Sequence, residues 1–249
     1  MTGDSNRAMG DLIVQKYGGS SLSGVEKIRS VARRIGESKD RGNSLVVVVS
    51  AMGDTTDDLL RQATSITDKP RQRELALLLS TGELVSCSML TMALHYLGYS
   101  AVSLSGSQAG IYTDSDYNQA RIIDIKTARI LRELDADNIV VVAGFQGVSD
   151  NMDVTTLGRG GSDTTAVALA ASLEANVCEI YTDVDGIYTA DPRVVPEARV
   201  MDEIGYEEMM ELASQGAKMH PRSIELGAIY GVPIKVTSSF LETKGTLIH

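Results

Sequence analysis

The sequence predicts an α/β protein, a three-layer α/β/α sandwich with a mainly parallel central sheet. Short segments rich in Val, Ile and Leu alternate with longer segments in which apolar residues recur at helical spacing; this is the pattern of strands alternating with helices. Two of the strand-like segments, 46–49 and 139–142, are continuously apolar, which is typical of parallel strands covered by helices on both faces. With 249 residues, 43% of them hydrophobic, the chain can bury a large core.

The expected elements follow in order from the N-terminus. Residues 1–11 are polar and lack the apolar stretch of a signal peptide, so we expect a disordered extension, with Met9 as an alternative start, before one domain at 12–249. The first helix is indicated by apolar residues at helical spacing from Val25 to Ile35. The expected strands are 12–16, 44–50, 100–104, 139–143, 177–182 and 232–237, and the expected helices are 24–38, 54–66, 71–97, 118–132, 163–175, 206–215 and 220–230.

Composition excludes several classes of function. The net charge is −10 and no run of basic residues occurs, which argues against nucleic-acid binding because phosphate contacts need clustered Lys and Arg. Cys87 and Cys178 have no metal-like spacing and there are only three histidines, which argues against a disulfide framework or a zinc site. Apolar runs such as 45–49 are too short to cross a membrane. We therefore expect a cytoplasmic enzyme without a membrane or nucleic-acid partner.

The glycine-rich segment from Thr156 to Ala166 has the composition of an anion site. Gly160 and Gly161 are expected to adopt φ > 0 and to let the backbone approach a ligand. Ser162 is the expected N-cap of the following helix, whose free N–H groups bind anions. Arg159 adds a planar fork suited to a carboxylate or phosphate. The alternative interpretation is a glycine-rich turn before a capped helix, without a ligand.

A second glycine segment follows the first expected strand. Lys16 ends this strand, and residues 18–21 read Gly-Gly-Ser-Ser before the helix begins. A strand, a Gly-Gly turn and a helix start form a phosphate cradle, in which Lys16 supplies a point charge. The P-loop pattern G-x-x-x-x-G-K-[ST] is absent from the chain, and no G-x-G-x-x-G occurs at this turn. A solvated lysine is the alternative.

Three motifs are expected to meet at one edge of the sheet. Lys16, Ser50 and residues 181–183 fall at or just past expected strand ends, and ligands of open parallel sheets bind at the carboxyl ends of the strands. The acidic stretch after residue 182 is not an EF-hand, because its fifth position is Ile187 and its twelfth is Val194.

Five ordered motifs resemble those of the aspartokinases. They are K-Y-G-G-S-S at 16–21, a second glycine-bearing loop at 50–57, T-G-E at 81–83, G-R-G-G-S-D-T-T at 158–165 and a nucleotide-side motif at 181–193. The resemblance runs from about residue 13 to 248 and identifies the chain as a member of this family. It implies the amino-acid-kinase fold, with an N-terminal amino-acid lobe and a C-terminal ATP lobe.

The resemblance also implies an activity, namely phosphorylation of the side-chain carboxylate of L-aspartate by ATP and Mg²⁺. The product would be 4-phospho-L-aspartate, on the route to lysine, threonine and methionine. A carboxylate is already a nucleophile, so catalysis needs positioning and charge neutralisation rather than a general base. Two alternatives stay open: a related kinase with a different acidic acceptor, and a nucleotide-binding paralogue without catalysis.

The roles of individual residues are carried over from the family motifs. Lys16 and Asp163 are the implied catalytic residues, and Asp163 would hold Lys16 or Mg²⁺, the metal otherwise binding through the ATP phosphates. Alternatively, Asp163 is a helix-start acid favoured by the macrodipole, and Glu83 a solvated one. The implied substrate residues are Ser50, Thr56, Glu83 for the ammonium, Arg159 for the α-carboxylate, Gly160, Gly161 and Ser162. The implied ATP residues are Lys16, Gly18, Gly19, Ser20, Tyr181, Thr182, Asp183, Tyr188, Asp191, Arg193 and Lys218.

The chain departs from the family pattern at three places. Segment 216–222 is one residue shorter than G-A-K-x-x-H-P-R, which bears on the position of Lys218. No histidine precedes A-R-I at 120–122, which favours a different acceptor. The chain stops at His249, where the family's ACT domains begin, so we expect no ACT domain and no inhibition by lysine or threonine. The implied assembly is a homodimer, and a separate regulatory subunit is a candidate partner.

Overall fold

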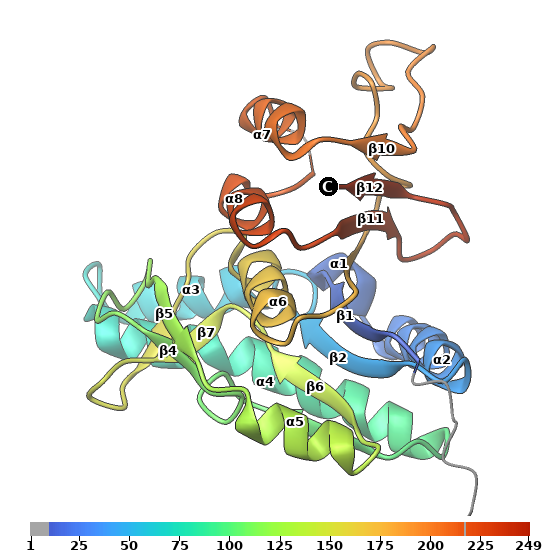
Figure 1. The fold of residues 1–249 in the computed structure, drawn as a ribbon. Helices are drawn as coiled ribbons and strands as arrows, with labels where there is room; N and C mark the ends of the chain where they lie inside the picture. The colour runs from blue at the N-terminus through green and yellow to red at the C-terminus, as the bar shows by residue number, and fades with distance from the viewer. Residues whose placement is uncertain (1–9, 217) are drawn as a thin grey trace, which may run out of the picture.

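The computed structural model describes residues 10–216 and 218–249. Most of the expected extension at 1–11, including Met9, lies outside the described residues. Figure 1 shows the chain order of the elements. They are β1 (Leu12–Tyr17), α1 (Gly19–Leu22), α2 (Val25–Asp40), β2 (Ser44–Val49), α3 (Thr55–Ile66), α4 (Gln72–Tyr96), β3 (Ala101–Leu104), β4 (Ile111–Thr113), β5 (Ile122–Ile125), α5 (Ala128–Asp135), β6 (Ile139–Ala143), β7 (Gln146–Val148), β8 (Val154–Thr156), α6 (Gly161–Ser172), β9 (Val177–Thr182), β10 (Glu203–Ile204), α7 (Tyr206–Ser214), α8 (Pro221–Tyr230), β11 (Ile234–Ser238) and β12 (Thr246–Ile248).

The main sheet has eight strands in the order β10-β12-β11-β9-β1-β2-β6-β3. All neighbours from β11 to β3 pair in parallel, and only β12 pairs with β11 antiparallel. The prediction of a mainly parallel sheet is therefore confirmed. In the register, Tyr17 lies beside Val49 on one side and Tyr181 on the other, so the carboxyl ends of β1, β2 and β9 meet at one edge.

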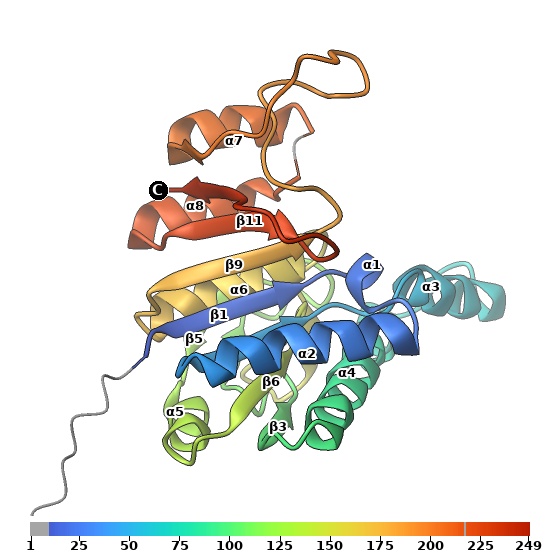
Figure 2. The ribbon, with the colours of Figure 1, turned by 90° about the vertical axis from the view of Figure 1, so that its right-hand side faces the viewer.

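Alternate residues of the central strands enter two separate cores. Val47 and Val49 pack with α2 and α4 on one face, whereas Val46 and Val48 pack with α6 on the other. Figures 1 and 2 show α2 and α6 on opposite faces of the sheet. Both faces of β2 are thus covered, which explains its continuous run of valines.

Helix α4 is the longest helix of the described chain, with 25 residues. By length and composition alone it could cross a membrane, a feature that the sequence analysis overlooked. Half of its most apolar window is buried inside the protein, and Leu90 and Leu94 are fully enclosed in the core beneath the sheet. The apolar residues of α4 thus belong to a helix that packs in the core of the protein.

A second, four-stranded sheet in the order β5-β4-β7-β8 was not predicted. The expected helix 118–132 is wrong in its first half, because residues 122–125 form β5 and α5 begins only at Ala128. Ile122 and Ile125 are three apart, which mimics helical spacing, but both pack against the main core while β5 pairs antiparallel with β4. Tertiary pairing of β-branched residues overrides the local pattern here.

The end of the β4–β5 ladder opposite the connection between these strands yields a stability prediction. Gly110 has φ 79° and accepts a hydrogen bond from Lys126 N, and a Cβ there would lie 2.2 Å from the Lys126 carbonyl oxygen. Gly98 has φ 89° with nothing within 4 Å. We expect Gly98→Ala to lower the free energy of unfolding by about 1–2 kcal/mol through left-handed strain alone, and Gly110→Ala to cost about 1–3 kcal/mol more through the clash. Urea denaturation of both variants measures the difference, and equal losses would contradict the clash.

Candidate functional site

An ion pair lies at the meeting point of β1 and α6. Lys16 Nζ is 2.7 Å from Asp163 Oδ1, and the two side chains are only 12% and 16% exposed. Asp163 Oδ1 receives no directed hydrogen bond from another described residue, so charge holds the contact. Because water is largely excluded, the attraction is stronger than in a surface pair. The structure thus brings the two expected catalytic residues, Lys16 and Asp163, into contact.

The start of α6 differs in detail from the prediction. Gly160 is the N-cap, with φ 69°, and Gly158 has φ 76°, whereas Gly161 is not among the residues with positive φ. The helix begins at Gly161 and ends at Ser172, so Ser162 lies inside the first turn and is not the N-cap. A Cβ on Gly160 would lie 2.3 Å from the Cβ of His220, which explains why glycine occupies the cap.

The two glycine loops after β1 and β2 pack tightly together. Gly53 N donates to the Gly19 carbonyl at 3.0 Å, and Ser50 N donates to the Tyr17 carbonyl at 3.1 Å. A Cβ on Gly19 would lie 2.6 Å from the Ala51 oxygen, and one on Gly18 would lie 3.5 Å from Lys16 Nζ. A side chain at position 18 would therefore lie against the ammonium of Lys16. Ser20 is exposed at the rim.

Glu83 is a buried carboxylate in the middle of α4, 3% exposed. Its Oε1 accepts a hydrogen bond from Ala51 N at 3.1 Å, whereas its buried Oε2 has no partner among the described residues. Burial raises the pKa of Glu83 to about 7. The alternative of a solvated acid at a helix start is therefore wrong. An unpartnered buried oxygen is costly, and its presence next to the glycine loops indicates a place for a cationic group.

The remaining expected substrate residues are Arg159, Ser162 and Thr56, and their side chains are held to different degrees. Arg159 is exposed and makes no hydrogen bond or ion pair with another described residue. Ser162 packs against the end of β6, since a Cβ on Gly144 would lie 2.8 Å from its Oγ. Thr56 is half-buried in the first turn of α3, whose neighbour Thr55 lies against Gly82 of α4. The guanidinium of Arg159 is thus free to bind an anion.

A pocket of about 730 Å³ lies between segment 183–193 and the end of α7. Lys218 Nζ is 2.8 Å from Asp183 Oδ1, and its hydrogen bond lowers the pKa of that carboxyl. Arg193 lies 2.8 Å from Asp191 and lowers the pKa of Asp191 to about 2. The pocket gathers the expected nucleotide residues Asp183, Tyr188, Asp191, Arg193 and Lys218.

Other expected nucleotide residues lie outside this pocket lining. Lys16 lies near the end of β1, the strand beside β9, and Thr182 ends β9. Gly18, Gly19 and Ser20 follow β1. The side chain of Tyr181 is buried: its ring stacks on Tyr17 with centroids 4.6 Å apart, and its hydroxyl donates to Glu179. Only the backbone of Tyr181 is therefore available to a nucleotide.

The sequence analysis missed a set of contacts that ties the strand ends together. Arg34 of α2 lies over the Tyr181 ring at 5.2 Å and donates to the Ser238 carbonyl at 2.9 Å. The hydroxyls of Ser21 and Ser239 are 2.6 Å apart and buried, although 218 positions separate them in the chain. No local pattern could have revealed contacts of this range. They fix α1, the short helix after β1, and helix α2 to the end of β11 and the loop after it.

Comparisons with known proteins agree with this geometry. The sequence model of the amino acid kinase family matches residues 11–238. An aspartokinase of Mycolicibacterium smegmatis is 56% identical over 239 residues, which are 95% of this chain and 57% of that protein. The chain thus spans little more than half the length of such a relative.

Solved structures superpose closely on the fold. An aspartate kinase from Synechocystis gives a TM-score of 0.86 at 50% identity, over 95% of this chain and 39% of that one. Aspartokinase III of E. coli, in complex with aspartate and ADP, gives 0.83 at 27% identity, over 96% of this chain and 64% of that one.

The buried carboxyl of Glu83 predicts a pH-dependent stability. In the unfolded chain Glu83 ionises near its ordinary pKa of 4.5, but in the folded protein it keeps its proton up to about pH 7. Its contribution to stability is therefore lost as pH rises from 4.5 to 7. The Glu83→Gln variant has no ionisable group at this position, so it does not lose this stability. Its free energy of unfolding minus that of the wild type should therefore rise by about 2–3 kcal/mol between pH 5 and pH 8.

Chemical denaturation at both pH values measures this change. The matched control is Glu37→Gln on the exposed side of α2, for which the relative stability should stay constant because the side chain is in water. A Glu83→Gln curve parallel to that of Glu37→Gln would show that the buried carboxyl is not protonated.

Proposed function

The chain belongs to the amino acid kinase family, and we propose that it transfers the γ-phosphoryl group of ATP to the side-chain carboxylate of L-aspartate. The observation that carries the proposal is the enclosed Lys16–Asp163 ion pair, placed where the glycine loops and the start of α6 meet. The aspartokinase relatives support the choice of substrate. The reaction forms a bond between a carboxylate oxygen and the γ-phosphorus and breaks the bond to the β-phosphate oxygen, releasing ADP and 4-phospho-L-aspartate.

Recognition of the amino acid rests on two opposite charges. The unpartnered Oε2 of Glu83 accepts the α-ammonium, and this cation favours the ionised form of a carboxyl whose pKa burial has raised to about 7. The free fork of Arg159 binds the α-carboxylate in a bidentate manner. Ser50, Thr56, Gly160, Gly161 and Ser162 complete the proposed substrate site.

Stabilisation of the transferring group rests on Lys16. Its ammonium, oriented by Asp163, neutralises charge on the phosphates, and the first turn of α6 adds backbone N–H groups and the positive end of the helix. The amides of Gly18 and Gly19 approach from the other side, since neither residue carries a side chain. The carboxylate acceptor needs no base, so orientation and charge neutralisation are sufficient.

The nucleotide is placed in the pocket lined by segment 183–193 and Lys218. Tyr188 and backbone groups face the base, while Asp183, Asp191, Arg193 and Lys218 face the ribose and phosphates, with Ser20, Tyr181 and Thr182 beside them. No group of three or more His, Cys, Asp or Glu side chains suited to a metal occurs in the described part of the chain. Mg²⁺ would bind through the ATP phosphates and would supply further positive charge, and Asp163 is the carboxylate that would hold it. The assembly that we propose is a cytoplasmic homodimer.

A different acidic acceptor is the second candidate, favoured by the absence of a histidine before Arg121 in segment 116–122. Trapping acyl phosphates with hydroxylamine across aspartate, glutamate and succinate decides between the two. Succinate lacks the ammonium that Glu83 would bind, so it should be a poor acceptor. Efficient phosphorylation of succinate or glutamate would show that aspartate is not the acceptor that this site selects.

The phosphate role of Lys16 predicts a large loss of turnover. Lys16→Met should lower kcat by roughly 10²–10⁴, as for the removal of one electrostatic stabiliser. The same change leaves Asp163 without its partner and should also lower stability. The double variant Lys16→Met with Asp163→Asn should regain stability but not turnover, measured by thermal denaturation and by ADP release. Near-normal turnover in either variant would remove Lys16 from the mechanism.

The substrate role of Arg159 predicts a change in KM. Arg159→Ala should raise the KM for aspartate about 30- to 1000-fold, the equivalent of a lost charge-assisted bidentate contact of about 2–4 kcal/mol, while the KM for ATP changes little. Folding should be unaffected because Arg159 is exposed and unpaired among the described residues. Steady-state kinetics with each substrate varied in turn gives the answer, and an equal effect on both KM values would contradict the assignment.

A further inference from the structure

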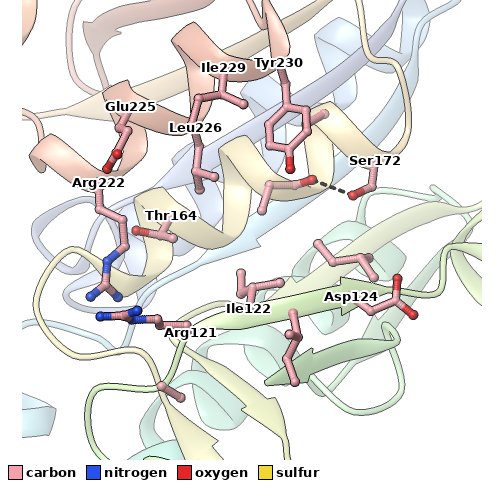
Figure 3. Close-up of a pocket in the computed structure, with 15 residues that line it drawn as sticks. Arg121, Ile122, Asp124, Thr164, Ser172, Arg222, Glu225, Leu226, Ile229 and Tyr230 are labelled. Atoms are coloured by element: carbon pink, nitrogen blue, oxygen red, sulfur yellow. Dashed lines mark hydrogen bonds between the residues drawn. The ribbon is translucent and has the colours of Figure 1, made fainter. Parts of the chain in front are cut away.

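A second pocket, of about 670 Å³, lies on the opposite side of α6 from Lys16. Its walls are the edge strand β5, helix α6 and helix α8 (Figure 3). Thr164, Ala168 and Ala171 recur at helical spacing along the face of α6 that forms its floor. None of the residues proposed for aspartate or ATP lines this pocket. Its volume is within the range of small-molecule sites.

One end of the pocket carries two arginines that face one another. Figure 3 shows the guanidinium groups of Arg121, the residue before β5, and Arg222 of α8 pointing toward each other. The side chain of Arg121 makes no ion pair or hydrogen bond with any described residue. The guanidinium of Arg222 donates only to the Leu157 carbonyl, at 3.2 Å, and pairs with no acid within the described chain. Two like charges repel unless an anion lies between them, and most of their N–H donors are unused.

Apolar side chains form most of the remaining wall, and Asp124, Glu225, Thr164 and Ser172 also line the pocket. Figure 3 shows Asp124 at the end away from the two arginines. Ile122 and Leu226 are half-buried on facing elements, and Ile229 and Tyr230 remain 65% and 64% exposed above them. Large apolar side chains left in water around a hollow mark binding surfaces. The apolar wall adjoins the cationic end, so the complementary ligand is an anion with an apolar body.

We propose that this pocket is a second binding site, for a small amphipathic anion. The carboxylate or phosphate head lies between Arg121 and Arg222, and the apolar body lies along Ile122, Leu226 and Ile229. Planar guanidinium groups bind both carboxylates and phosphates in bidentate fashion. The two arginines therefore suit either head group, and the experiment below distinguishes a carboxylate from a phosphate. The inference is independent of the reaction catalysed on the other side of α6.

Isothermal titration calorimetry with octanoate and with octyl phosphate tests the site. At least one of the two should bind saturably with one molecule per chain, and the tighter of them identifies the head group. Octylamine has the same apolar body with a cationic head and should not bind. Absence of saturable binding by both anions, or equal binding of octylamine, would overturn the proposal.

Variants locate the binding. Arg121→Gln removes a side chain without partners in the described chain and should weaken binding about tenfold or more. Ile229→Glu, at an exposed position, should weaken it further by placing a carboxylate beside the ligand. Arg33→Gln on α2, across the sheet, removes the same charge far from the pocket and should leave the affinity unchanged. Unaltered affinity in Arg121→Gln and Ile229→Glu would place the ligand elsewhere.

A second copy of this chain is the alternative occupant of the pocket. Sedimentation velocity tests this alternative by measuring the oligomeric state. If Ile229→Glu abolishes self-association and the wild-type protein binds neither anion, the pocket is an interface between copies and the proposal is wrong.

Discussion

The pairing of β1 with both β2 and β9 is the constraint on which the rest of the structure depends. β1 comes from the beginning of the chain and β9 from its second half, and the parallel register brings Tyr17 between Val49 and Tyr181. Parallel strands must end at the same edge, so this single arrangement delivers Lys16, the 50–54 loop and segment 182–183 to one place. The stack of Tyr17 on Tyr181 and the reach of Arg34 to Ser238 reinforce the same edge from the α2 side. The scaffold therefore sets the positions of the site before any ligand binds.

Two acidic residues at this edge are accommodated in different ways. Asp163 has its counterion inside the protein, because Lys16 approaches to 2.7 Å. Glu83 has a backbone N–H on one oxygen and nothing on the other, and its pKa rises to about 7 as a result of burial. Ionising the buried Glu83 is costly in the free protein and becomes favourable when a cation binds beside it. Such a carboxyl is suited to select a ligand with an ammonium. The contrast between the two acids separates an internal organising group from a recognition group.

The sequence was informative where chemistry or burial constrains single residues. The valine run of β2 indicated a strand covered on both faces, and glycines at 158–161 indicated the turn into α6. Prediction failed where long-range contacts decide. Segment 122–125 has helical spacing of isoleucines but pairs with β4. Ser162 has the chemistry of an N-cap, yet the left-handed Gly160 starts the helix two residues earlier because the ring of His220 packs against it. The contact of Ser21 with Ser239 has no local signature at all.

The loop from Leu157 to Gly161 connects the two sides of α6. On one side it presents the free Arg159, and on the other its carbonyls are held by groups of the second pocket: Arg222 binds the Leu157 oxygen, and Thr164 Oγ1 donates to the Gly160 oxygen at 3.1 Å. His220 lies where a Cβ on Gly160 would be, so this left-handed position accepts only glycine without displacing His220. The backbone on either side of Arg159 is thus held from behind, by residues that never meet the substrate of the proposed reaction. Helix α8 is in this way a structural part of the site, although none of its side chains reaches the Lys16–Asp163 pair in the described contacts.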